Sequence, residues 1–186
     1  MTKSIVHKIK NIAIVFSIAM FFSCTNDPKE VKDFLADKNL PIGEATDINL
    51  KHTDSGRVDV RMKAPLMLDF GNRENHPYSE FPKGIIITTI EKNGDSTVIQ
   101  GDYAKTYGKT SVAEIKNNVV IYNYAKKNKL ETSEIYWDQI THYFFTEKRF
   151  TFFTATDTIY GTGFEATEKL DVWWVKNQSG VIEIKD

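Results

Sequence analysis

The sequence predicts an all-β protein, because strand-forming residues are abundant and turn-forming clusters recur at short, regular intervals. Leucine is scarce, whereas Ile, Val, Thr, Phe and Tyr are frequent. In the second half of the chain, turn-type clusters follow one another about every ten residues, with no helical pattern between them. They lie near Asn117, Asn128, Asp138, Glu147, Asp157, Glu168 and Gln178. Such spacing is typical of a sandwich, a barrel or a roll.

The size and charge of the chain exclude several classes of protein. With 186 residues, the chain is long enough for one ordinary domain and too short for two. Its 24 basic and 25 acidic residues leave no positive surplus for phosphates, so no nucleic-acid partner is expected. The single cysteine, Cys24, excludes an internal disulfide and a cysteine-based zinc cluster.

Residues 1–23 have the pattern of a secretory signal peptide. Lys3, Lys8 and Lys10 precede an uncharged, largely apolar run over residues 12–22. As a helix, this run would cover roughly 17 Å, whereas the hydrocarbon core of a membrane is roughly 30 Å thick. The segment is therefore expected to be removed and not to remain as a membrane span.

The only cysteine follows this segment directly. Phe21-Phe22-Ser23-Cys24 resembles the lipobox of bacterial lipoproteins, in which the cysteine thiol is acylated and becomes the mature N-terminus. Cys24 would then be the lipid anchor, and residues 24–41 a lipidated N-terminus and tether ahead of a β-domain over residues 42–186. The alternatives are an ordinary signal peptide with an incidental cysteine and a signal anchor with a buried one.

Period-two alternation predicts two hairpins in the first half of the β-domain. The first joins strands around residues 48–50 and 58–62 through the turn Asp54-Ser55-Gly56. The second is centred on Asn93-Gly94-Asp95, the strongest short hairpin signal in the chain. Because successive side chains of a strand project to opposite faces, each strand would gather its apolar residues on one face.

The sequence contains no set of residues with catalytic or metal-binding spacing, so no enzyme, cofactor or metal site is expected. Gly108-Lys109-Thr110 lacks the first glycine of a phosphate-binding loop, because that position is Tyr103. The histidines of the β-domain, His52, His76 and His142, are widely separated. Carboxylates are numerous, but nothing distinguishes two of them as a glycosidase pair.

Four stretches of the strand pattern stand out by their order and spacing. They are Phe81-Pro82-Lys83-Gly84-Ile85, Asn118-Val119-Val120-Ile121, Leu130-Glu131-Thr132-Ser133-Glu134-Ile135-Tyr136-Trp137-Asp138 and Gly161-Thr162-Gly163-Phe164-Glu165-Ala166. Together they resemble the LptC family, the periplasmic component of the lipopolysaccharide-export transporter. The resemblance spans nearly the whole β-domain. Many family members keep an uncleaved transmembrane helix, whereas this chain offers a lipobox.

The resemblance implies a twisted, open-ended β-jellyroll of many short antiparallel strands over residues 42–186, with an apolar interior. Such a protein would lie in the periplasm as a membrane-anchored lipoprotein, with the inner membrane expected over the outer. It would receive lipopolysaccharide from an inner-membrane ABC transporter and pass it to the next β-jellyroll of a bridge across the periplasm. It would need no cofactor and perform no covalent chemistry, because a separate cytoplasmic partner hydrolyses ATP.

Aromatic residues crowd the strands beyond residue 143, more than a small sandwich with one wet face per sheet requires. We expect part of this excess to line a groove for acyl chains, which needs apolar walls with few polar groups. The residues expected to point into the groove are Val119, Ile121, Ile135, Trp137, Phe150, Phe152, Ile159, Leu170, Val172 and Trp174. Lys148 and Asp171 are expected outside it. The alternative is a large structural core.

An open jellyroll has edge strands whose N–H and C=O groups can pair with another protein. We expect the edge near Ile48 and Leu50 to meet the transporter, and the C-terminal strand with Val181, Ile182 and Ile184 to receive the next bridge subunit. Alternatively, the C-terminal strand pairs on both sides within its own domain. Two other classes stay open, namely a closed-barrel lipid- or ligand-binding lipoprotein and a structural or adhesive envelope lipoprotein.

Overall fold

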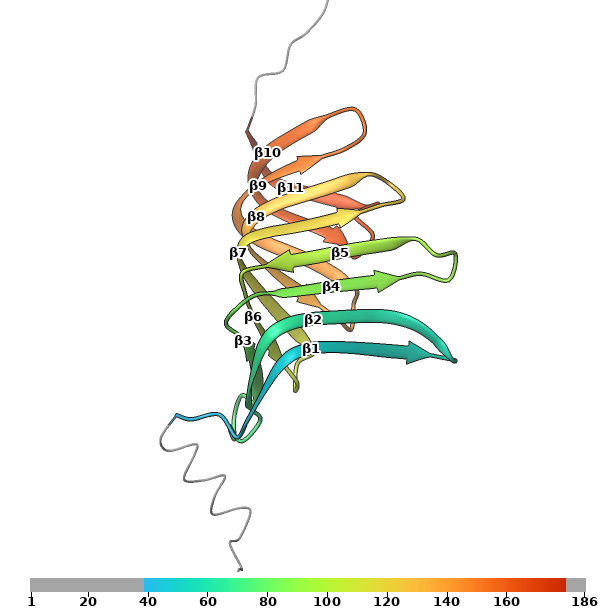
Figure 1. The fold of residues 1–186 in the computed structure, drawn as a ribbon. Coiled ribbons are helices and arrows are strands. Elements are labelled where there is room, and N and C mark those ends of the chain that lie inside the picture. Colours follow the sequence, from blue (N-terminus) through green and yellow to red (C-terminus); the bar gives the residue numbers. More distant parts are fainter. Residues whose placement is uncertain (1–38, 180–186) are drawn as a thin grey trace, which may run out of the picture.

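The computed structural model describes residues 39–179, in which eleven strands form one antiparallel sheet and no helix occurs (Figure 1). The strands are β1 (Gly43–Asp54), β2 (Arg57–Phe70), β3 (Tyr78–Phe81), β4 (Ile85–Ile90), β5 (Ser96–Gly101), β6 (Tyr103–Tyr107), β7 (Val112–Asn123), β8 (Asn128–Asp138), β9 (Tyr143–Phe153), β10 (Thr158–Thr167) and β11 (Trp173–Ser179). The predicted all-β class is confirmed. The expected signal peptide, Cys24 and most of the expected tether lie outside the described residues. Within the described range, no helix could span a membrane.

The sheet divides into two arms that share most of their strands. In β7, residues 112–116 pair with β6, whereas residues 120–123 pair with β5. In the same way, β2 pairs with β4 along one half and with β3 along the other. We call the half with β4 and β5 the β4–β5 arm, and the half with β3 and β6 the β3–β6 arm. The remaining strands run through both arms.

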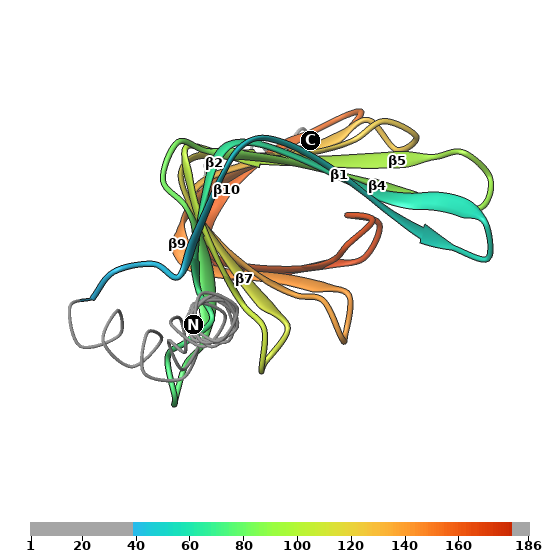
Figure 2. The same ribbon diagram turned by 60° about the horizontal axis from the view of Figure 1, so that its bottom comes forward.

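The shared strands bend between the arms at irregularities of their pairing. Register shifts interrupt the pairing of β7 with β8 and of β9 with β10, and such bulges bend and twist a strand. Asn117 and Asn118 have φ of 61° and 51° inside the β7 shift, a conformation that Asn tolerates better than most residues. Gly163 takes φ 78° at the shift in β10. The result is a twisted, two-armed shell that opens along one side (Figure 2).

Hydrogen bonds tie the link between β5 and β6 to the bend of β7. The Asp102 N–H group donates to the carbonyl oxygen of Asn117 at 3.0 Å. Asn118 Nδ2 in turn donates to Asp102 Oδ2 at 2.6 Å. The link between β5 and β6 passes from the β4–β5 arm to the β3–β6 arm. The two hydrogen bonds therefore fix this crossing point to the bend of β7.

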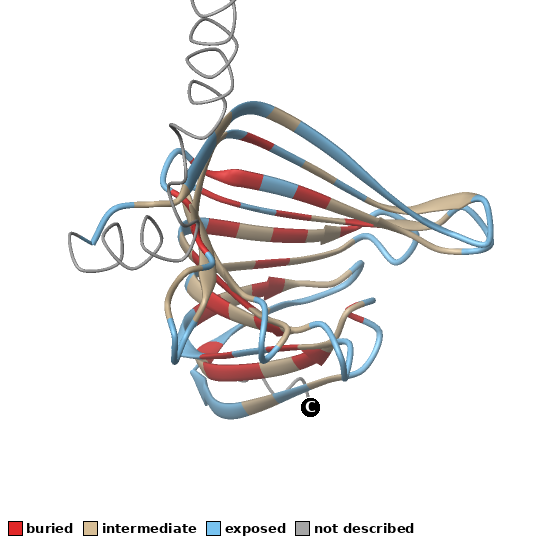
Figure 3. Cartoon of the chain, turned by 90° about the horizontal axis from the view of Figure 1, so that it is seen from below, coloured by how far each residue is buried: buried red, intermediate tan, exposed pale blue. Residues whose placement is uncertain are grey.

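The hydrophobic core lies between the arms, where side chains from the two inner faces meet. Buried and exposed positions alternate along the strands, as expected for strands covered on one face (Figure 3). Aromatic rings join the arms near β10 and β11. Phe164 packs against Phe150 and Phe152 with centroid distances of 4.9 and 5.0 Å, and Trp173 packs against Phe152 at 5.3 Å. Such ring pairs add to the stabilisation that comes from buried area.

The sheet does not close on itself. Within residues 39–179, β1 pairs only with β2 and β11 pairs only with β10, so both are edge strands. An antiparallel sheet that bends into two arms and keeps two free edges is an open β-jellyroll, as the resemblance implied. The closed-barrel alternative is therefore wrong for the described part of the chain.

Both predicted hairpins are present, as β1–β2 and β4–β5. Ser55 and Gly56 have positive φ of 50° and 80°, the combination that two-residue hairpin turns favour. In the second turn, Gly94 has φ 91°, and Asn93 Oδ1 accepts a hydrogen bond from the Asp95 N–H group at 3.0 Å. The short strands β3 and β6, of four and five residues, were not predicted.

We expect Gly161→Ala to destabilise the fold, because β10 packs too closely there for any side chain. A Cβ at this position would overlap the carbonyl oxygen of Asn177 in β11 and approach the ring of Phe150 to 2.8 Å. Overpacking of this kind costs about 1–3 kcal/mol. Gly108→Ala is the matched control, since nothing lies within 4 Å of a Cβ there. Urea unfolding of both variants checks the prediction, which equal free energies of unfolding would contradict.

Candidate functional site

A continuous row of apolar side chains runs along the inner face of the β4–β5 arm. Directly paired residues of antiparallel strands project from the same face, so the strand pairings define the row. It consists of Leu50, Met62, Ile87, Ile99, Ile121, Leu130, Phe152 and Ile159. We call this row the inner rail. Eight neighbouring strands, from β1 to β10, each contribute one side chain to it, and none of these is polar.

The inner rail changes from open to closed along its length. Leu50, at the β1 end, is 49% exposed, and Met62 on β2 is half-buried. From β5 to β9 the rail is inaccessible to solvent, with Ile121 and Phe152 both 0% exposed. Ile159 on β10 is again partly buried and packs against the core. The apolar interior of the shell is therefore accessible at its β1–β2 side and filled by side chains of the opposite arm farther on.

The inner face of the β3–β6 arm combines small and large apolar residues. Cross-strand pairing aligns Ala113, Trp137, Phe144, Ala166 and Trp173 from β7 to β11. Trp137 is buried, and its Nε1 donor has no acceptor among the described residues. An indole N–H in an apolar interior normally finds a partner, because an unpaired buried donor costs free energy. Trp137 thus offers an unused hydrogen-bond donor beside the apolar walls of the interior.

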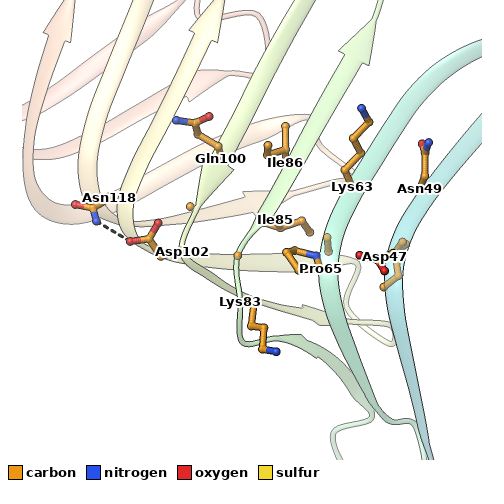
Figure 4. Close-up of a pocket in the computed structure, with 14 residues that line it drawn as sticks. Asp47, Asn49, Lys63, Pro65, Lys83, Ile85, Ile86, Gln100, Asp102 and Asn118 are labelled. Atoms are coloured by element: carbon orange, nitrogen blue, oxygen red, sulfur yellow. Dashed lines mark hydrogen bonds between the residues drawn. The ribbon is translucent and has the colours of Figure 1, made fainter.

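The outer face of the β4–β5 arm is polar by contrast. Two shallow hollows of about 660 and 900 Å³ follow the bend there and meet at Asn118. In Figure 4, the polar side chains of Asn49, Lys63 and Gln100 line the first hollow, and the Asn118–Asp102 hydrogen bond closes one side of it. A surface with this many amide and charged groups does not favour acyl chains.

The outer face of the β3–β6 arm carries paired charges and hydroxyl groups. Tyr136 Oη donates to Glu114 Oε1 at 3.0 Å, and Lys116 Nζ lies 2.7 Å from the same oxygen. Burial, together with the hydrogen bond to Glu114, raises the pKa of Tyr136 to about 12, so its hydroxyl remains a donor at neutral pH. Within residues 39–179, no group of His, Cys, Asp or Glu is arranged to hold a metal ion.

The structure places most of the predicted groove residues in the interior. The buried ones are Val119, Ile121, Ile135, Trp137, Phe150, Phe152 and Leu170, while Ile159 is partly buried against the core. Lys148 and Asp171 are exposed, as expected. The structure adds inner-rail residues that were not predicted, from Leu50 on β1 to Ile99 on β5. Their signal was the period-two alternation of the first two hairpins.

The predicted inward orientation of Val172 and Trp174 is wrong, because their side chains are 47% and 52% exposed. Trp174 pairs with Glu165 and so belongs to the outer face, whereas its neighbour Trp173 pairs with Ala166 on the inner face. Leu170 is buried from within the turn, where it has φ 51°. Alternation counted forward from Leu170 across that turn therefore assigns the wrong face to Trp174 in β11.

The predicted edge residues divide between described and undescribed parts of the chain. Ile48 and Leu50 lie on β1, which is an edge strand. Val181, Ile182 and Ile184 lie outside the described residues. The last described strand, β11, ends at Ser179 and forms the opposite edge of the sheet.

The fold and the inner rail define the class of protein, an open β-jellyroll with an apolar interior and outer faces that carry most of the charged groups together with exposed apolar residues such as Trp174 and Phe145. The chain belongs to the LptC family: the family model for lipopolysaccharide-assembly, LptC-related proteins matches residues 12–182. No curated protein matches the chain. Membership gives the protein a role in lipopolysaccharide transport, in a family that is periplasmic and associated with the inner membrane.

Proposed function

We propose that the inner rail carries the acyl chains of lipopolysaccharide while the protein passes the lipid from an inner-membrane ABC transporter to the next β-jellyroll of a periplasmic bridge. The unbroken apolar row across eight strands is the observation that supports this proposal. Each methylene group that leaves water gains about 0.8 kcal/mol. A row that offers one apolar side chain per strand can therefore hold an acyl chain without any specific polar contact.

The unpaired indole donor of Trp137 adds a polar contact to this proposal. Acyl chains of the lipid are attached through ester and amide groups, whose carbonyl oxygens accept hydrogen bonds. Full-length protein purified from membranes should carry lipopolysaccharide or take it up from micelles. Protein that stays free of the lipid after such incubation would refute the proposed function.

The two edges of the sheet supply the proposed docking sites. We assign the β1 edge, with Ile48 and Leu50, to the transporter and the C-terminal segment, with Val181, Ile182 and Ile184, to the next bridge subunit. Free edges that bind a neighbour do so by adding its strand to the sheet. β1 and β11 each have one paired side among the described strands, which supports this arrangement.

Ile182→Pro should abolish capture of the bridge subunit, because proline removes a backbone donor from the proposed edge. Ile182→Ala is the matched control, since it keeps the N–H group and changes only the side chain. Pull-down of the bridge subunit, with circular dichroism of each variant, measures the effect. Normal capture by a folded Ile182→Pro protein would exclude this edge as the docking surface.

Cys24 is the proposed lipid anchor on the membrane. Labelled fatty acid should enter the wild-type protein and not Cys24→Ala, which should be released from the membrane or mislocalised. Several acyl chains together hold a protein durably, whereas a single chain holds it only marginally. An unlabelled, fully membrane-retained wild-type protein that keeps residue 1 would contradict the anchor.

A further inference from the structure

The loop between β10 and β11, residues 168–172, spans the opening between the two arms. Lys169 Nζ lies 2.7 Å from Glu91 Oε2, at the end of β4. Asn128 Nδ2, at the start of β8, donates to the carbonyl oxygen of Leu170 at 2.8 Å. Both partners lie on the β4–β5 arm, whereas the loop extends from the β3–β6 arm. Figure 2 shows this orange-red end of the β10–β11 hairpin turned toward the opposite arm.

Leu170 extends from the loop into the core and is 0% exposed. It adopts φ 51°, a conformation that bulky residues avoid unless the surroundings impose it. The Leu170 N–H group donates to the carbonyl oxygen of Thr167 at 2.9 Å, and the Thr167 N–H group donates to that of Val172 at 3.0 Å. The turn is thus held in the one shape that directs the leucine inward.

The base of the loop is fixed to its own arm by the turn between β8 and β9. His142 Nδ1 lies 2.7 Å from Glu168 Oε2, and the Glu168 N–H group donates to the carbonyl oxygen of His142 at 2.9 Å. Of the polar contacts that the described loop residues 168–172 make, those of Lys169 and Leu170 reach the β4–β5 arm. Separation of the arms would therefore break those contacts and leave the loop itself intact.

A cavity of about 190 Å³ lies beside this loop, between the arms. Val60, Thr89 and Thr97 line it from the β4–β5 arm, and His142, Glu168 and Lys169 line it from the opposite side. On the β1–β2 side the inner rail is accessible, whereas from β5 to β9 it is fully buried. The loop therefore stands near the boundary between the open and the closed part of the interior.

We propose that this loop is a clasp, and that Leu170 decides how far an acyl chain moves along the inner rail. The chain enters from the β1–β2 side and passes toward β10 only when Leu170 leaves its buried site. The ion pair of Lys169 with Glu91 is partly exposed and contributes less than the buried leucine, which is the dominant contact. This inference rests on the proposed lipid-carrying function.

Leu170→Asn tests the clasp, because asparagine accepts the positive φ of this position and removes only the buried apolar side chain. Val172→Asn is the matched control on the exposed side of the same loop. Each variant is made in the full-length protein with a benzophenone side chain at Leu50 or at Ile159, the two ends of the inner rail. Photocrosslinking to purified lipopolysaccharide is measured at each end.

We expect Leu170→Asn to raise capture at Ile159 about tenfold and to leave capture at Leu50 unchanged, with Val172→Asn matching the parent protein. Tenfold corresponds to about 1.4 kcal/mol, within the gain from burying one leucine. Unchanged capture at Ile159 in Leu170→Asn would overturn the clasp alone. Absence of capture at Leu50 in every protein would refute the proposed function and, with it, the clasp.

A charge swap keeps the proposal testable where Leu170→Asn lowers the yield of folded protein. Lys169→Glu should raise capture at Ile159 by a few fold, and adding Glu91→Lys should restore the parent value, because the reversed pair can form again. Lys176→Glu is the control, since Lys176 pairs with Glu147 and Glu165 on its own arm. Equal capture by Lys169→Glu and Lys176→Glu would also overturn the clasp.

Discussion

Ile121→Lys should unfold the domain, whereas Val120→Lys, one position away on β7, should leave it folded. Ile121 is 0% exposed and pairs with Ile99 and Leu130 on the inner rail. An unpaired ammonium group there would cost at least about 4 kcal/mol, out of the roughly 5–15 kcal/mol that stabilise an ordinary domain. Val120 instead pairs with Glu131 on the outer face, where a lysine gains an opposite charge.

Circular dichroism and urea unfolding of the two variants measure this difference. The Val120→Lys protein should lie within about 1 kcal/mol of the wild type in its free energy of unfolding. Because adjacent residues of a strand project to opposite faces, a register slip of one residue would reverse the two results. Similar destabilisation by both substitutions would contradict the assignment of inner and outer faces.

Leu50→Asp should leave the domain folded and reduce the lipopolysaccharide that it carries at least tenfold. Leu50 is 49% exposed at the open end of the inner rail, so its replacement costs little in folding. An acyl chain that binds there must displace water from the carboxylate. The free-energy cost of this desolvation exceeds the roughly 1.4 kcal/mol that corresponds to a tenfold loss of affinity. The effect should therefore fall on lipid binding and not on stability.

Asn49→Asp is the matched control, because Asn49 belongs to the same strand but pairs with Lys63 on the outer face. Quantification of lipopolysaccharide that co-purifies with each full-length variant, beside thermal unfolding, separates the two effects. A Leu50→Asp protein that retains as much lipid as Asn49→Asp would show that this end of the inner rail does not hold acyl chains.

The sequence predicted the inner faces of β7 to β10 because alternation there is carried by strongly apolar residues. Phe150 is the clearest case, since Arg149 and Thr151 flank it and its side chain is buried. The two hairpin turns were predictable for the same local reason, as Gly56 and Gly94 take the positive φ that their turns need. Local chemistry decides both features, so a single sequence suffices for them.

The face of β11 could not be predicted from alternation, because the two-residue alternation of side chains does not continue through the turn that precedes this strand. Leu170 is buried from a left-handed position and not from a strand, so counting in twos from it assigns Trp174 to the interior. The pairing of Trp173 with Ala166 decides the question instead. Such pairing depends on a register that residues within β11 do not determine alone.

The division of the sheet into arms and the clasp depend on contacts between distant residues. β3 has only four residues, too few for a period-two signal, and it exists because β2 and β6 pair with it. Lys169 and Glu91 are 78 positions apart, and both look like ordinary surface charges in the sequence. No local pattern distinguishes them from the other lysines and glutamates of the chain.

Photocrosslinking in cells, with benzophenone side chains at Met62 and at Lys63, tests the central claim most directly. The two positions are neighbours on β2, but Met62 pairs with Ile87 on the inner rail and Lys63 pairs with Ile86 on the outer face. A lipid groove inside the shell predicts that lipopolysaccharide is captured at Met62 and not at Lys63. Equal capture at the two positions, or capture at Lys63 alone, would contradict it.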